Sequence, residues 1–153
     1  MPALGKIDLD QVVARVQTVL KNFPQVAGAY LFGSSLDLCR PNSDIDLGLV
    51  LEPEIKPDSK EGDKLEADIA LYLPPVDGHP FDIVLLDPDK PLFTFRVLKK
   101  GKLIYCRNME RVTDVVEYVS RRYADLYPRY IRALDEVISE VRESGSGSPA
   151  DTI

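Results

Sequence analysis

Two short motifs in this chain carry residue types that bind metal ions and phosphate. Gly33-Ser34 ends one apolar run, and Asp44-Ile45-Asp46 begins the next. Because side chains along a strand alternate between its two faces, Asp44 and Asp46 are predicted to point the same way, roughly 6–7 Å apart. That separation suits two carboxylates that share divalent cations.

Gly33 and Ser34 stand where the first strand is expected to turn into a helix. Free backbone N–H groups at a helix start bind phosphate oxygens, and a residue without a side chain lets phosphate approach closely. We therefore expect these two residues to hold the β and γ phosphates of a nucleotide. Ser35 either touches phosphate through its hydroxyl or caps the short helix. Metal carboxylates beside a phosphate-binding turn suggest nucleotidyl transfer.

A third carboxylate, Asp82, interrupts the apolar run Phe81–Leu86. An aspartate in such a strand is costly to bury unless a cation or a hydrogen-bond partner compensates it. If this strand lies beside the Asp44 strand, three carboxylates converge on two hard cations, Mg²⁺ or Mn²⁺. Asp44 and Asp46 would then bridge both metals. Asp82 would complete the metal on the attacking side and help to deprotonate an acceptor hydroxyl.

Composition limits the classes of protein to which the chain can belong. Its 153 residues are 44% hydrophobic, which predicts one globular domain with a real core. The net charge of -6 argues against a nucleic-acid polymerase or backbone-binding protein, since phosphate contacts need clustered Lys and Arg. Cys39 and Cys106 form neither a disulfide framework nor a zinc motif. With no signal peptide and no apolar run near the ~18 residues that span a membrane, a cytoplasmic location is expected.

The spacing of apolar residues predicts the elements that position these motifs. Helical spacing indicates helices, and short apolar runs bounded by turn residues indicate strands. The expected order is a helix over 9–23, a strand over 26–32, one or two helical turns over 34–38, a strand over 44–51, a helix over 60–73, a strand over 81–86, a helix over 92–100 capped by Gly101, and an edge strand over 103–105. This pattern predicts a small α/β (α+β) domain with helices packed on a mixed sheet.

A long helical pattern covers residues 108–143 and completes the predicted domain, 1–143. Pro128 lies inside it and is expected to kink the helix without breaking it. Residues 144–153 are rich in Ser and Gly and are predicted to be a disordered tail. Tyr123 and Tyr130 fall on the apolar stripe and are expected to pack against this domain's own sheet.

Other polar and aromatic side chains of this helix are candidates for a surface that binds a partner or a second copy. They are Tyr118, Tyr127 and the arginines between 121 and 132. The alternative is that these tyrosines also pack within the domain. His79, in the turn before the third strand, is expected to be a solvated loop residue.

Together these motifs resemble the DNA polymerase beta-type nucleotidyltransferase superfamily. They are Gly33-Ser34, a spacer of nine residues, Asp44-Ile45-Asp46 and the later Asp82. The size is that of its minimal nucleotidyltransferases. Residues 96–105 and the long helix that follows are similar to the MntA-type antitoxin branch, so that the resemblance covers residues 5–142. It implies ATP as substrate, a HEPN-domain RNase toxin as partner, and transfer of AMP to a toxin tyrosine, which silences the toxin.

Two features depart from the family pattern. The spacer is one residue shorter than usual, and Leu36-Asp37-Leu38 stands where an arginine often follows the Gly-Ser pair. Arg40, which comes later, is the remaining candidate for a nucleotide-binding arginine. An acid that faces a triphosphate weakens binding, so either Asp37 points outward or activity is reduced.

Two other functions therefore stay open beside AMP transfer to a toxin. One is a binding-only antitoxin with a vestigial nucleotide site, which the short spacer and Asp37 favour and the three carboxylates oppose. The other is AMP transfer to a small molecule, such as an aminoglycoside. Enzymes of that kind usually need an additional acceptor domain, and this chain has only one long helix after its core.

Overall fold

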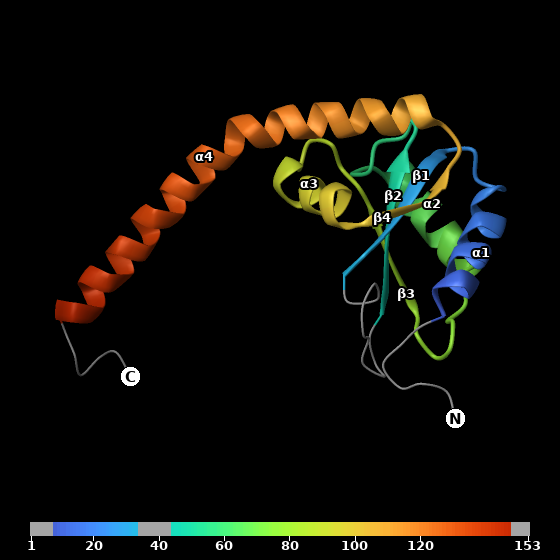
Figure 1. The fold of residues 1–153 in the computed structure, drawn as a ribbon, viewed down its shortest axis with the longest axis horizontal. Helices are drawn as coiled ribbons and strands as arrows, with labels where there is room; N and C mark the ends of the chain where they lie inside the picture. The colour runs from blue at the N-terminus through green and yellow to red at the C-terminus, as the bar shows by residue number, and fades with distance from the viewer. Residues whose placement is uncertain (1–7, 34–43, 148–153) are drawn as a thin grey trace.

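The computed structural model describes residues 8–33 and 44–147, and it describes side chains as far as residue 143. These residues form a four-stranded sheet with helices on both of its faces (Figure 1). In chain order the elements are α1 (Leu9–Leu20), β1 (Val26–Phe32), β2 (Ile45–Leu51), α2 (Lys60–Leu71), β3 (Phe81–Leu85), α3 (Pro91–Lys100), β4 (Lys102–Cys106) and α4 (Met109–Gly147). The predicted fold class is confirmed.

The sheet has the strand order β3-β2-β1-β4. β1 pairs antiparallel with both β2 and β4, whereas β2 and β3 are parallel. The helix α2 connects β2 to β3, as a parallel pair requires a crossover connection. The strand that carries Asp82 therefore lies directly beside the strand that carries Asp46.

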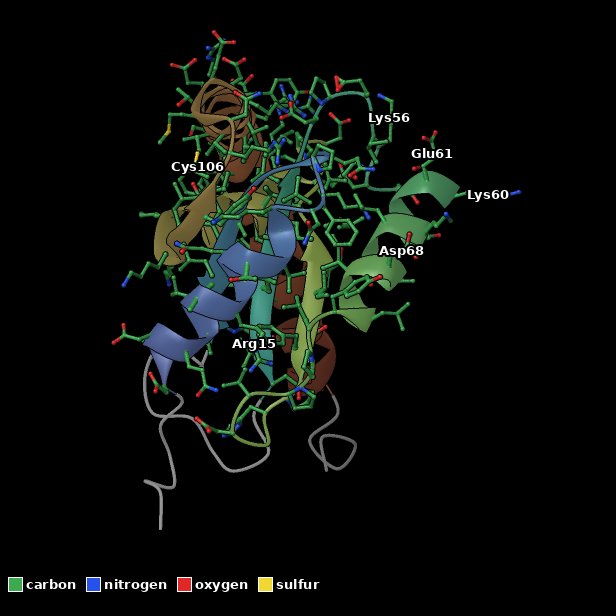
Figure 2. The ribbon with its side chains drawn as sticks, turned by 90° about the vertical axis from the view of Figure 1, so that its right-hand side faces the viewer. Arg15, Lys56, Lys60, Glu61, Asp68 and Cys106 are labelled. Carbon is green, nitrogen blue, oxygen red and sulfur yellow. The ribbon has the colours of Figure 1, made fainter. Side chains whose placement is uncertain are left out.

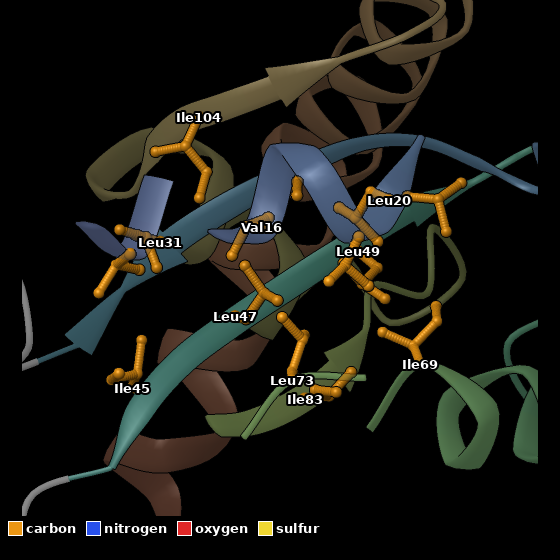
Figure 3. Close-up of a cluster of buried hydrophobic side chains, with 14 of the residues drawn as sticks. Val16, Leu20, Leu31, Ile45, Leu47, Leu49, Ile69, Leu73, Ile83 and Ile104 are labelled. Carbon is orange, nitrogen blue, oxygen red and sulfur yellow. The ribbon is translucent and has the colours of Figure 1, made fainter. Parts of the chain in front are cut away.

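The alternation along β2 divides its side chains between two cores. Ile45, Leu47 and Leu49 point to the face covered by α1 and α2, where they join the larger apolar cluster (Figure 3). Val50 points to the opposite face and packs in a second cluster with residues of α3 and α4. Both faces are thus covered along most of the strand, and Asp46 shares the second face with Val50.

The helix α4 has two parts with different surroundings. Its beginning lies across α3 and the sheet, and Val112, Val115 and Val119 are buried there. Its remainder bends and runs away from the body of the protein (Figure 1). Pro128 provides a cause for this bend, because it has no N–H to donate to the preceding turn. The helix is unbroken at Pro128, as predicted, and extends to Gly147.

Some predictions need correction. Tyr130 does not pack on the sheet: it lies on the projecting part of α4 and is exposed. His79 is buried, not solvated, and its backbone pairs with Val76 in an isolated bridge. Gly101 does cap α3, but in an extended conformation, with φ of -77°. The predicted helical turns over 34–38 lie outside the described residues, within which no helix is long and apolar enough to cross a membrane.

Candidate active site

Asp46 and Asp82 are direct partners in the parallel β2–β3 pair. Partners in adjacent strands are about 4.8 Å apart and project from the same face of the sheet. Asp46 is partly buried and Asp82 is exposed, so that the pair opens to solvent. Asp44 is exposed and lies immediately before β2. The structure therefore brings together the three aspartates that the sequence predicted to converge.

The pKa of Asp46 reflects both its burial and the neighbouring carboxylates. It is raised above the ordinary aspartate value, first by burial of the carboxyl and then by repulsion from Asp82 and Asp44. The pKa of Glu66 in α2 is raised by burial, by Asp63 and by Asp82. This end of the sheet consequently carries a concentration of negative charge that favours the approach of a cation.

Gly33 provides the space that the Asp46 carboxylate occupies. It follows β1, whose last residue, Phe32, pairs with Asp46. A Cβ atom built on Gly33 would collide with the Asp46 carboxylate, and its φ of +77° lies in the left-handed region that favours glycine. Gly33 is thus required both by the backbone turn and by the position of the carboxylate.

The other predicted phosphate-binding residues, Ser34, Ser35 and Arg40, lie outside the described part of the chain. So does Asp37, whose orientation relative to a triphosphate the structure does not address. Among the predicted site residues, the described geometry covers Gly33, Asp44, Asp46 and Asp82.

Two cavities run along the outer side of β3 next to these aspartates. One, of about 410 Å³, is lined by Asp82 together with Asp63 and Glu66 of α2. The other, of about 330 Å³, is lined by Glu66, Lys90 and Phe93, among others. Glu66 and Ile83 border both cavities, so that together they form a hollow along the edge strand between α2 and α3.

Glu66, Lys90 and Phe93 were not predicted from the sequence. Lys60 and Glu61, on the same helix as Glu66, are exposed and point outward to solvent (Figure 2). Glu66 is partly buried, because it follows the buried Leu65 by one residue and lies at the border of the apolar stripe. That position is a weak signal, because helix borders carry charged residues in most proteins. Phe93 packs edge-on against Phe32, with ring centroids 6.1 Å apart.

The donor chemistry of the site fits hard divalent cations. Within residues 8–33 and 44–147, no group of three His, Cys, Asp or Glu side chains is placed to hold a metal ion by itself, so that a cation here would need further ligands from a substrate and water. Mg²⁺ is commonly held by one or two carboxylates together with substrate phosphates and water. A partly buried Asp46 that lies against Gly33 and an exposed, in-register Asp82 match that open mode of binding.

Comparison with known proteins agrees with this geometry. The model of the polymerase beta nucleotidyltransferase family matches residues 14–110. No curated protein sequence matches the chain. Among solved structures, the fold resembles a crystal structure of the toxin–antitoxin MntA–HepT, with a TM-score of 0.60, 19% identity, and coverage of 84% of this chain and 98% of the other.

Two further structures show the same likeness. One is a tri-AMPylated Shewanella oneidensis HEPN toxin in complex with its MNT antitoxin, with a TM-score of 0.61, 19% identity, and coverage of 84% of this chain and 98% of the other. The other is a toxin–antitoxin with AMP-PNP, with a TM-score of 0.57, 18% identity, and coverage of 82% and 98%. At this level of identity the likeness establishes the fold.

Proposed function

Because the chain belongs to the polymerase beta nucleotidyltransferase family, we propose that it is a metal-dependent protein adenylyltransferase and the antitoxin of a HEPN-domain RNase toxin. Its substrates are ATP and a tyrosine of the toxin, and its products are AMP-tyrosine and pyrophosphate. The observation that carries the proposal is the in-register pair Asp46–Asp82 beside the Gly33 turn. The proposal places the two substrates on either side of this pair.

The chain's own groups have distinct tasks in the proposed reaction. Asp82, the more exposed of the pair, accepts the proton of the tyrosine hydroxyl. The phenolic oxygen then bonds to the α-phosphorus of ATP, and the bond from that phosphorus to the oxygen bridging to the β-phosphorus breaks. Mg²⁺ or Mn²⁺ bound by Asp44, Asp46 and Asp82 would neutralise the triphosphate and the departing pyrophosphate.

Positioning accounts for much of the proposed rate enhancement, as in other phosphoryl-type transfers. The turn at Gly33 fixes the Asp46 carboxylate from one side, and the β2–β3 pairing fixes Asp82 from the other. Gly33, Ser34, Ser35 and Arg40 are proposed to bind the triphosphate, since they form or follow this turn. The hollow along β3 is open to an acceptor that approaches Asp82.

Two findings on similar proteins support the choice of substrates. A neighbouring structure contains AMP-PNP, which is an ATP analogue. Another contains a tri-AMPylated HEPN toxin in complex with its antitoxin. The choice of a toxin tyrosine as acceptor rests on the chemistry that the family resemblance implies. Asp82 is exposed, so that it can accept the proton of a hydroxyl on another protein.

Position-labelled ATP tests the reaction. The purified chain and a HEPN-domain protein from the same organism are incubated with Mg²⁺ and ATP that is labelled on either the α- or the γ-phosphate. Label on the HEPN protein from α-labelled ATP alone is the expected result. Label from γ-labelled ATP would contradict AMP transfer, because it would show phosphorylation.

The same experiment separates the two alternative functions. A stable complex of the two proteins without any label would identify a binding-only antitoxin. No complex and no label, together with pyrophosphate release in the presence of a hydroxylated small molecule, would identify a small-molecule transferase. Asp44→Asn/Asp46→Asn is the matched variant, since it keeps side-chain shape and removes two charges.

A further inference from the structure

The projecting half of α4 carries an apolar stripe with the spacing of a coiled coil. Beyond the buried Val119, large apolar residues recur at alternating steps of three and four. They are Tyr127, Tyr130, Leu134, Val137 and Val141, and each is between 37% and 66% exposed. A sustained alternation of three and four is the pattern of a helix that packs along another helix.

The stripe is continuous with a row of aromatic rings that begins in the folded domain. Phe95 of α3 stacks on Tyr123, with ring centroids 3.9 Å apart, and Tyr123 stacks on Tyr127 at 5.0 Å. Tyr130 lies next in the row, 6.5 Å from Tyr127. Among the described residues, no second helix or strand runs along the projecting part of α4 (Figure 1). A contiguous exposed apolar face of this kind marks an interaction site.

The charges on this part of α4 are separated along its length. Residues 121–132 contain four arginines against one aspartate, whereas residues 133–143 contain four carboxylates against one arginine. A second copy in antiparallel orientation would place each basic segment against an acidic one. A parallel pair would place like charges side by side, which is unfavourable.

We propose that the projecting halves of two copies pair as an antiparallel coiled coil, so that the protein forms a homodimer. Antiparallel pairing that sets Tyr127 opposite Val137 of the second copy also sets Tyr130 opposite Leu134. Each layer then combines an aromatic ring with a smaller aliphatic side chain, which fills the space between the helices. In the same register Arg129 lies level with Asp135 of the second copy.

The two functional regions stay apart in such a dimer. The buried beginning of α4 is held to its own domain, where Arg111 Nε donates to the Leu51 carbonyl at 2.9 Å and Tyr118 donates to Asp89 at 2.9 Å. Pairing through residues 127–141 uses none of these groups. The dimer is therefore independent of the proposed AMP transfer, and either can fail without the other.

Light scattering on the full chain alone tests the dimer. The expected mass is twice the 17.1 kDa of the monomer. Leu134→Asp should restore the monomer, whereas the matched control Ser139→Asp, on the opposite side of the helix, should leave the dimer intact. Thermal unfolding of both variants checks that the domain itself stays folded. A wild-type monomer at every concentration, or a dimer that Leu134→Asp does not affect, would overturn the proposal.

Disulfide trapping tests the orientation. Tyr127→Cys and Val137→Cys are made as separate chains in which Cys39 and Cys106 are both replaced by Ser, and the two chains are mixed and oxidised. Antiparallel pairing predicts a disulfide mainly between the two different chains. Disulfides mainly within each population, 127 to 127 and 137 to 137, would show a parallel pair and contradict the proposed register.

Discussion

Two regions of the protein carry side chains that are unfavourable in the chain alone: the aspartate end of the sheet and the projecting half of α4. The side chains are charged in the first region and apolar in the second. At the sheet end, burial of the Asp46 carboxyl and its repulsion from Asp82 and Asp44 disfavour the charged form and raise the pKa of Asp46. On α4, exposed apolar side chains face water. The first region needs a cation and a phosphate ligand, and the second needs an apolar surface.

The backbone is also fixed to different degrees in the two regions. Asp46 and Asp82 are set by strand pairing and by the Gly33 turn, so that their geometry exists before any ligand binds. The projecting half of α4 depends on helix formation over a stretch that receives little tertiary support. The fixed geometry of the two aspartates favours catalysis at the sheet end. The projecting half of α4 is instead suited to association with another protein surface.

Removal of one carboxylate at the sheet end should have the largest effect. Asp46→Asn is expected to lower AMP transfer by roughly 10²–10³-fold, which is typical when one electrostatic contact to a transition state is lost. Thermal stability without metal should be unchanged or slightly higher, because the substitution removes a partly buried charge and its repulsion with Asp82. Transfer rates and thermal unfolding measure both effects. Asp114→Asn, at an exposed position of α4, is the control.

A pair of glycines separates backbone strain from positioning of the carboxylate. Gly33→Ala and Gly78→Ala both place a side chain at positive φ, +77° and +81°, and each should cost about 1 kcal/mol of folding free energy. A Cβ at Gly78 meets nothing within 4 Å, whereas one at Gly33 collides with the Asp46 carboxylate. Only Gly33→Ala should therefore reduce transfer strongly. Equal transfer by the two variants would contradict the proposed positioning role.

A pair of valines compares the two halves of α4 directly. Val115→Ala removes a side chain that is 2% exposed and should cost about 2 kcal/mol of folding free energy. Val137→Ala removes one that is 55% exposed, and for the monomer it should cost no more than about 0.5 kcal/mol. Denaturant unfolding of dilute protein measures both. A large cost for Val137→Ala that grows with protein concentration would instead reflect the proposed dimer.

The smallest effect is expected at Glu66, where the pKa is raised by burial and by Asp63 and Asp82. A raised pKa means that the folded protein binds this proton more tightly than the unfolded chain, so the charged carboxylate opposes folding above that pKa. Glu66→Gln should accordingly be slightly more stable than wild type at neutral pH. The difference should shrink as the pH falls through the raised pKa toward 4.5. Glu54→Gln, in an exposed loop, is the matched control substitution.

The sequence predicted the parts of the fold and site that depend on local pattern. The alternation that predicted one face for Asp44 and Asp46 also divides β2 between two cores, because period two is a property of the strand itself. The predicted convergence of Asp82 with Asp46 depended on strand order, which short-range pattern leaves open. The structure supplied that order and the exact register. Glu66 joined the site only because α2 packs beside β3.

Two other differences have the same origin. His79 lies in a turn sequence that predicts solvent exposure, but the folded chain covers its side chain, and local sequence does not encode such tertiary contacts. Tyr130 shares the helical stripe of Tyr123, but the domain ends between them. Periodicity identifies the face of a helix that becomes buried, and it does not show whether the same chain provides the surface that covers it.

Intact-mass spectrometry of the HEPN-domain partner decides whether the chain transfers AMP to it. The partner is incubated with ATP and Mg²⁺ together with either the wild-type chain or the Asp44→Asn/Asp46→Asn variant. We expect the partner to gain one or more AMP units with the wild-type chain and none with the variant. An unmodified partner that the wild-type chain nevertheless binds and inhibits would contradict AMP transfer as the basis of neutralisation.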